Sequence, residues 1–229
     1  MAKVKRPAWS FSSFKTFEGC PRKYYHTKVV KDYQENFDTP AIKYGNEFHK
    51  AAELYIKSNK PLEPRFEFAK PSLDKLNSMG GKKLCEFKMA LTENLEPCTY
   101  FAQDVWFRGV ADLLIVDADT GVAKVIDYKT GGNTSYADGR QLELMALAIF
   151  KHFPEVTTVK AGLLFVVANA FIKDEFTIDR EGEMWKRWFA HYEDLITAYK
   201  TGVWNPIKTG LCKNHCIVMS CAHNGRRGD

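Results

Sequence analysis

The fold of this chain is decided by two short segments, GVADLLIV (residues 109–116) and VIDYKTG (residues 125–131). Both are rich in Val, Ile and Leu, which predicts neighbouring β-strands, and DADTG (117–121) is a suitable hairpin connection between them. Three charged residues, Asp112, Asp127 and Lys129, interrupt the apolar runs, and a charge in a buried strand is costly unless it is paired or coordinated. Asp127 and Lys129 lie two residues apart, so their side chains point to the same face of the strand.

The composition of the chain sets wide bounds. It has 229 residues, of which 45% are hydrophobic and 27% charged, as in an ordinary globular domain with a substantial core. The net charge of +5 permits nucleic-acid binding without requiring it. Residues 1–7 lack an apolar signal core, and no apolar run approaches the roughly 18 residues of a membrane span. We therefore expect a cytoplasmic protein whose six cysteines are thiols or metal ligands.

The order of the predicted elements indicates the fold class. Residues at helical spacing form two adjacent stripes, one with Tyr44 and Phe48 and one with His49. This spacing predicts a helix from Pro40. Residues 58–81 hold three prolines and a Gly-Gly pair, which predicts little regular structure. The elements predicted next are strands over 85–95, 104–116 and 122–129, a helix over about 138–152, strands over 159–168 and 171–178, and a long aromatic helix around Trp188. This order predicts an α/β fold with a central mixed β-sheet flanked by helices.

Side chains suited to binding a metal ion converge on the two central strands. Asp112 and Asp127 supply the hard oxygen ligands that Mg²⁺ or Mn²⁺ prefers, and His49 adds a nitrogen ligand that favours Mn²⁺. A bound divalent ion lowers the pKa of a water molecule and polarises a phosphate. Lys129 is placed to position that water and to stabilise charge in the transition state, and Gln141 opens the next helix nearby. This chemistry is that of a metal-dependent phosphodiesterase.

Each of these residues taken alone has a simpler explanation. An aspartate at a strand end or bulge explains Asp112, and an exposed pair near a turn explains Asp127 and Lys129. A partly buried histidine explains His49. Their order along the chain favours the joint site over the separate explanations.

The motif order resembles that of the PD-(D/E)XK nucleases. Gly45-x-x-x-His49, GVAD (109–112), IDYKTG (126–131) and Gln141 follow one another as in the RecB-like exonucleases. This subgroup includes CRISPR-adaptation exonucleases and many phage-encoded single-domain nucleases. The resemblance covers nearly the whole chain, from about residue 12 to residue 221.

The resemblance implies a restriction-endonuclease-like core, DNA as the partner, and a bacterial cell or a phage-infected host as the setting. The roles that it implies are metal ligation by His49, Asp112, Asp127 and the carbonyl of Tyr128, catalysis by Lys129, and contact of Gln141 with the substrate or the active centre. The family often has Gln-x-x-x-Tyr, but Met145 stands in the tyrosine position here, which affects substrate preference or digestion polarity. Glu86 matches an acidic position of some relatives, although a surface glutamate explains it as well.

Three cysteines crowd the C-terminal tail: Cys212, Cys216 and Cys221. Three soft ligands within ten residues are hard to explain by packing, so unrelated thiols are the weaker alternative. A closed metal site needs a fourth ligand, for which Cys20 is the candidate. The pattern resembles the iron–sulfur staple of the RecB-like subgroup, which implies a [4Fe–4S] cluster that joins the N- and C-terminal segments. The family's tail more often reads Cys-x2-Cys-x5-Cys, so a structural Zn²⁺ completed by Cys20, His215 or His223 stays open. Cys85 and Cys98 are interpreted as ordinary thiols.

Basic and aromatic residues alternate in residues 3–9, 22–25 and 186–188. Such mixtures suit a nucleic-acid strand that is held by its phosphates and stacked through its bases. A solvated face with a buried aromatic is the alternative, and for Trp188 it is the stronger one.

Taken together, these features predict one nuclease domain over residues 1–229, a Mg²⁺- or Mn²⁺-dependent DNA exonuclease whose ends are tied by a metal cluster. Two other functions compete with it: a nucleic-acid-binding module with lost or residual catalysis, and a site- or structure-specific endonuclease. The intact set of acidic, basic and histidine side chains argues against the binding module. The cysteines and Gln141 favour the exonuclease.

Overall fold

The computed structural model describes residues 8–36 and 38–226, which fall into two compact units. The first unit joins the two ends of the chain, residues 1–37 and 186–229, and the second unit holds residues 38–185. Most of the first predicted basic stretch, residues 3–7, lies outside the described residues. The single nuclease domain stays a prediction.

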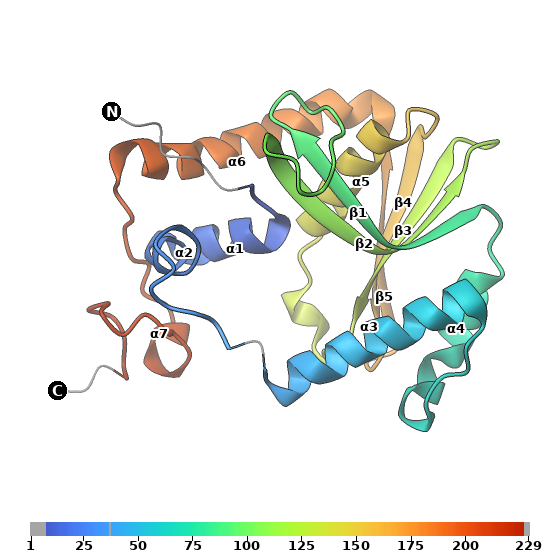
Figure 1. Ribbon diagram of the computed structural model, residues 1–229, viewed down its shortest axis with the longest axis horizontal. Coiled ribbons are helices and arrows are strands. Elements are labelled where there is room, and N and C mark those ends of the chain that lie inside the picture. Colours follow the sequence, from blue (N-terminus) through green and yellow to red (C-terminus); the bar gives the residue numbers. More distant parts are fainter. Residues whose placement is uncertain (1–7, 37, 227–229) are drawn as a thin grey trace. The chain divides into compact units, whose positions relative to one another are not determined.

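The second unit is built on one five-stranded sheet (Figure 1). Its strands follow one another in sequence order: β1 (Lys82–Thr92), β2 (Val105–Asp117), β3 (Val122–Lys129), β4 (Thr158–Phe165) and β5 (Ala170–Thr177). β3 and β4 pair in parallel, whereas the other neighbouring strands pair antiparallel. The parallel pair requires a crossover connection, which contains α5 (Arg140–His152). The predicted α/β class with a mixed sheet is confirmed.

Helices cover both faces of this sheet. α3 (Pro40–Ser58) and α4 (Lys70–Asn77) share one buried cluster with the sheet. Members of this cluster include Phe48, Ala52, Leu73, Leu113, Ile115 and Ile126. α5 lies on the other side of the sheet (Figure 1), with its residues from Leu144 to Phe150 all buried. The central strands are therefore enclosed, which explains their nearly continuous apolar runs.

The segment 58–81 is more regular than predicted. It holds the 3-10 helix η2 (Pro64–Ala69) and then α4. Pro64 and Pro71 occupy the first-turn positions of these helices, where the missing N–H of proline costs no hydrogen bond. The prediction of little regular structure is wrong, because these prolines begin helices.

The remaining elements are short, apart from one long helix. They are α1 (Phe11–Gly19), α2 (Pro21–Tyr24), the π-helix η1 (Tyr25–Val29), the 3-10 helices η3 (Thr134–Tyr136) and η4 (Ile178–Arg180), α6 (Glu181–Thr201) and α7 (Leu211–Asn214). Among the helices of the described part of the chain, none is long and apolar enough to cross a membrane.

Aromatic side chains form the core of the first unit. The ring of Trp188 lies 5.9 Å from that of Trp9 and 5.6 Å from that of Phe14, measured between centroids. Trp9, Tyr24 and Trp188 are each exposed by 2% or less. A role in base stacking is therefore wrong for these three rings, because they are buried. The alternative of a buried aromatic, which the sequence favours for Trp188, is correct.

We expect Trp188→Ala to lower the free energy of unfolding by about 3–5 kcal/mol, because it removes a buried indole and leaves a cavity. Phe189, the next residue of α6, is 37% exposed, and Phe189→Ala is the matched control with a clearly smaller loss. Urea unfolding measures both variants. Equal losses would contradict the assignment of Trp188 to the core.

Candidate active centre

The backbone ladder between β2 and β3 ends where the charged residues begin. Its last pair at this end joins Leu113 to Ile126. Beyond that pair, the side chain of Asp112 replaces a backbone acceptor, since its Oδ2 accepts a 2.6 Å hydrogen bond from the N–H of Tyr128. Asp112 and Asp127 are thereby held in buried positions, with exposed fractions of 9% and 7%. Two buried carboxylates this near to each other require positive charge around them.

His49 reaches the same place from α3. Its Nδ1 lies 3.2 Å from Asp112 Oδ1, and its Nε2 lies 3.1 Å from the carbonyl oxygen of Tyr128. Both partners are acceptors, so an imidazole that is protonated on both nitrogens satisfies both contacts. Burial lowers the pKa of His49, but the hydrogen bond and charge of Asp112 outweigh it, and the net pKa is raised. Gly45, one turn earlier, lets α3 approach Thr130, because a Cβ there would lie 3.3 Å from the threonine hydroxyl.

Glu86 completes a compact group of possible metal ligands. One ligand atom each from His49, Glu86 and Asp112 lies within 4.8 Å of the others. Glu86 stands in β1 between the residues paired with Leu113 and Ala111, which is the position facing Asp112. Its backbone φ of 52° is a left-handed conformation, which is uncommon for a glutamate within a strand. Burial, followed by the charge of Asp112, raises the pKa of Glu86.

Asp127, Lys129 and Gln141 form a second, connected group. Lys129 Nζ lies 2.5 Å from Asp127 Oδ2 and donates to Gln141 Oε1 at 3.3 Å. Gln141 Nε2 in turn donates to Asp127 Oδ1 at 2.7 Å. The last residues of β3 and the first turn of α5 therefore hold each other in place. Burial, and then the charge of Asp112, raise the pKa of Asp127 against the opposing effect of Lys129.

The donor set of this centre fits a hard divalent cation. It offers carboxylates, one imidazole and one backbone carbonyl, which are ligand types that Mg²⁺ and Mn²⁺ accept. Asp127 Oδ2 is buried and forms an ion pair with Lys129 Nζ at 2.5 Å, so this oxygen already attracts a cation. Asp127 stands outside the group of three formed by His49, Glu86 and Asp112.

All the residues predicted for this centre are brought together in the second unit: His49, Asp112, Asp127, Tyr128, Lys129 and Gln141. Glu86 was the weaker candidate in the sequence, although it belongs to the tightest group of possible ligands. The available signal was a charge within the alternating segment that contains Phe87 and Met89. Met145, in the position of the family's tyrosine, is buried in α5.

The four cysteines of the predicted staple lie in the first unit. Cys20 is the N-cap residue of α2, and its Sγ accepts a hydrogen bond of 3.5 Å from the N–H of Ile207. The Sγ of Cys212 lies 3.8 Å from the carbonyl oxygen of the same Ile207. One residue thus connects the N-terminal cysteine to the first cysteine of the tail.

Backbone hydrogen bonds fold the tail around its other cysteines. The buried Asn224 donates its side-chain amide to the carbonyl of Cys216 at 3.0 Å, and its N–H to the carbonyl of Cys221 at 3.0 Å. In the described part of the chain, no three of the cysteine sulfurs lie within 4.8 Å of one another.

Comparison with known proteins finds a matching family model and similar solved structures. A family model described as the PD-(D/E)XK nuclease superfamily matches residues 8–221. A solved structure of a candidate exonuclease from Eubacterium rectale has a TM-score of 0.51 at 13% identity, covering 91% of this chain and 86% of that chain. The structure of SSO0001 has a TM-score of 0.48 at 15% identity, covering 96% of this chain and 88% of that chain. At 13% identity, the likeness to the Eubacterium rectale structure shows a shared fold alone. No sequence among the curated proteins matches this chain.

Proposed function

Because this chain belongs to the PD-(D/E)XK nuclease superfamily, we propose that it is a divalent-metal-dependent exonuclease that hydrolyses phosphodiester bonds of DNA. The observation that carries this proposal is the convergence of Asp112, Asp127 and Lys129 with His49 where the backbone ladder between β2 and β3 ends. A module that only binds nucleic acid has no use for two buried carboxylates held this close to an amine and an imidazole.

Each residue of the centre receives a role from its contacts. Asp112, Asp127, His49, Glu86 and the carbonyl of Tyr128 would hold Mg²⁺ or Mn²⁺. When bound, this ion supplies Lewis acidity toward the scissile phosphate and lowers the pKa of a water molecule.

The remaining two side chains act on the reacting groups. Lys129 presents its ammonium group at the rim of the site, where its side chain is 34% exposed, and stabilises negative charge that builds on the phosphate. Gln141 bonds to both Asp127 and Lys129, so it sets the distance between the carboxylate and the amine.

Two features favour exonuclease action on DNA over site-specific cleavage. The His49 position and Gln141 follow the RecB-like pattern, and both side chains contact the centre. The candidate exonuclease from Eubacterium rectale shares the fold.

Cys20 and the three tail cysteines would bind a [4Fe–4S] cluster that ties the chain ends, with a structural Zn²⁺ as the alternative.

The experiment that tests this function follows cleavage of DNA labelled at an end or internally, in single- and double-stranded form, with Mg²⁺, Mn²⁺ or a chelator. An exonuclease releases the end label first and leaves covalently closed circles intact. Cleavage of closed circles would indicate the endonuclease instead. The absence of metal-dependent cleavage on every substrate would overturn the proposed function.

We expect Glu86→Gln to weaken the binding of Mn²⁺ by at least about tenfold, because the variant removes one charged donor from the group around Asp112. Titration calorimetry measures this affinity. Glu96→Gln, an exposed glutamate between β1 and β2, is the control and should bind the ion as the wild type does. Unchanged affinity in Glu86→Gln would exclude Glu86 as a ligand.

A further inference from the structure

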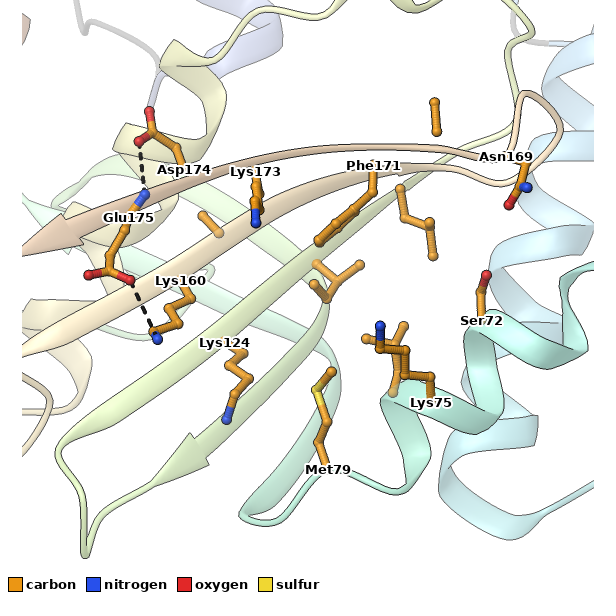
Figure 2. A pocket seen from close by; sticks show the side chains of 15 residues that line it. Ser72, Lys75, Met79, Lys124, Lys160, Asn169, Phe171, Lys173, Asp174 and Glu175 are labelled. Atoms are coloured by element: carbon orange, nitrogen blue, oxygen red, sulfur yellow. Dashed lines mark hydrogen bonds and ion pairs between the residues drawn. The ribbon is translucent and has the colours of Figure 1, made fainter.

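A groove of about 600 Å³ lies between α4 and the sheet in the second unit (Figure 2). Its floor comes from β3, β4 and β5, and α4 supplies one wall. Leu76, Ile126 and Leu164 contribute apolar surface at its base. These three residues also belong to the buried cluster under α3 and α4, so the groove continues the core outward across the sheet.

Four lysines line this groove: Lys75, Lys124, Lys160 and Lys173. Lys124 and Lys160 are register partners on the parallel strands β3 and β4, an arrangement of like charges that destabilises a sheet unless an anion offsets it. Lys160 forms an ion pair of 3.5 Å with Glu175. Within residues 8–36 and 38–226, no carboxylate pairs with the other three lysines. The groove therefore carries an excess of positive charge.

An aromatic ring forms a platform within this groove. Phe171 is 51% exposed, although it lies on a strand beside the lysines. Its ring rests on Gly162 so closely that a Cβ at that position would lie 2.3 Å from the ring carbons. Gly162 thus allows the ring to lie on the sheet, as Figure 2 shows for Phe171 among the lysines. A flat, half-exposed ring surrounded by cations suits a base that stacks while its phosphates are held.

The groove and the candidate active centre share strand β3 but use its two faces. Side chains two residues apart on a strand point to the same face, so Lys124 faces the groove and α4, whereas Asp127 and Lys129 face α5. The end of β3 lies beside the β4–β5 connection, since the carbonyl of Lys129 accepts a 2.9 Å hydrogen bond from Val166 N–H, three residues before the groove residue Asn169. A strand that is cleaved beside Lys129 would therefore pass around the end of β3 to enter the groove.

We propose that this groove binds a single nucleic-acid strand, with a base stacked on Phe171 and phosphates held by Lys75, Lys124 and Lys173. The proposal rests on the proposed nuclease function and adds a binding site for the strand on the face of the sheet that α4 covers. An acidic polypeptide would also complement the lysines, but it offers no general partner for the exposed ring. The alternation of ring and cations therefore favours the nucleic acid.

The test measures binding of fluorescent single-stranded oligonucleotides in chelator, where no cleavage occurs. Phe171→Ala should weaken binding at least about fivefold, since one base–aromatic stack is worth about 1 kcal/mol or more. Phe68→Ala is the matched control, because Phe68 has a similar exposed fraction of 48% and does not line the groove. Gly162→Ala should displace the ring and reproduce the loss, with no further loss when combined with Phe171→Ala.

The lysines are tested through the salt dependence of the same binding. The double variant Lys124→Ala/Lys173→Ala should reduce the slope of log affinity against log salt by about 1.4, because each phosphate contact on a single strand contributes about 0.7. Lys50→Ala/Lys60→Ala, two exposed lysines outside the groove, should leave the slope unchanged.

A second readout separates this proposal from the proposed function. Hydrolysis of a mononucleotide p-nitrophenyl ester should keep its kcat in the groove variants, whereas KM for a long oligonucleotide should rise at least about fivefold. If affinity, salt slope and KM are unchanged in the groove variants, the proposed strand-binding role of the groove is overturned, even if the enzyme cleaves DNA. Loss of oligonucleotide binding in the variants without any wild-type cleavage would support the groove and overturn the nuclease. Tight binding of poly-glutamate that is lost in the lysine double variant, with oligonucleotide binding unaffected, would assign the groove to a protein instead.

Discussion

We expect Lys129→Ala to lower the rate constant of metal-dependent DNA cleavage roughly 100- to 1,000-fold, the usual loss for one preorganised group that stabilises transition-state charge. The reason is its position: Nζ lies 2.5 Å from Asp127 Oδ2 and is held by Gln141 at the rim of the centre. Single-turnover cleavage of an end-labelled oligonucleotide measures the chemical step.

Metal binding separates the role of Lys129 from that of the aspartates. Lys129→Ala removes a cation beside the carboxylates, so its affinity for Mn²⁺ should equal or exceed that of the wild type. Asp127→Asn removes a charged donor, so its affinity for Mn²⁺ should be weaker. Lys60→Ala, a change of the same kind at an exposed position, should keep full activity. Cleavage by Lys129→Ala within tenfold of wild type would exclude a catalytic role for this amine.

The second large effect concerns the cysteines of the proposed staple. Anaerobically purified protein should be brown and contain stoichiometric iron, and Cys20→Ser or Cys212→Ser should lose the iron. Both sulfurs contact Ile207, so each variant removes a proposed ligand from the same place in the first unit. We expect a loss of several kcal/mol in the free energy of unfolding, because the binding energy of a structural metal group is part of the folding energy.

Cys98→Ser is the control for this prediction, since Cys98 lies in the second unit, outside the staple. It should retain both the iron and the stability of the wild type. Zinc without iron in the wild-type protein would show that the cysteines form a tetrahedral zinc site. The absence of both metals, with Cys20→Ser as stable as wild type, would show that these residues are unrelated thiols.

Much of the fold could be predicted because local patterns and tertiary packing agree. The apolar runs around Leu113 and Ile126 are long enough to identify buried strands, and the stripe through Phe48 identifies α3. The segment around Pro64 and Pro71 differs from its prediction, since a proline that begins a helix and a proline that interrupts one look alike locally.

In the candidate centre too, some residues can be identified from the sequence and others cannot. Asp112, Asp127 and Lys129 are visible as charges inside apolar strands, so the chain alone marks them. Glu86 is not marked in that way, because its importance comes from the register of β1 against β2 and from its left-handed backbone. For Trp188 the sequence favours a buried aromatic over a base-stacking residue, and its burial agrees with that.

The sequence by itself determined the family, the mixed sheet and the residue types of the centre, because these depend on residue identity, spacing and apolar period. Only the tertiary structure decided which partner each charge meets, since His49 and Asp112 are 63 positions apart and touch only through the packing of α3 on the sheet. The groove with Phe171 on Gly162 also belongs to the tertiary structure. No local pattern specifies it, because its lysines come from α4 and three strands that meet only in the folded chain.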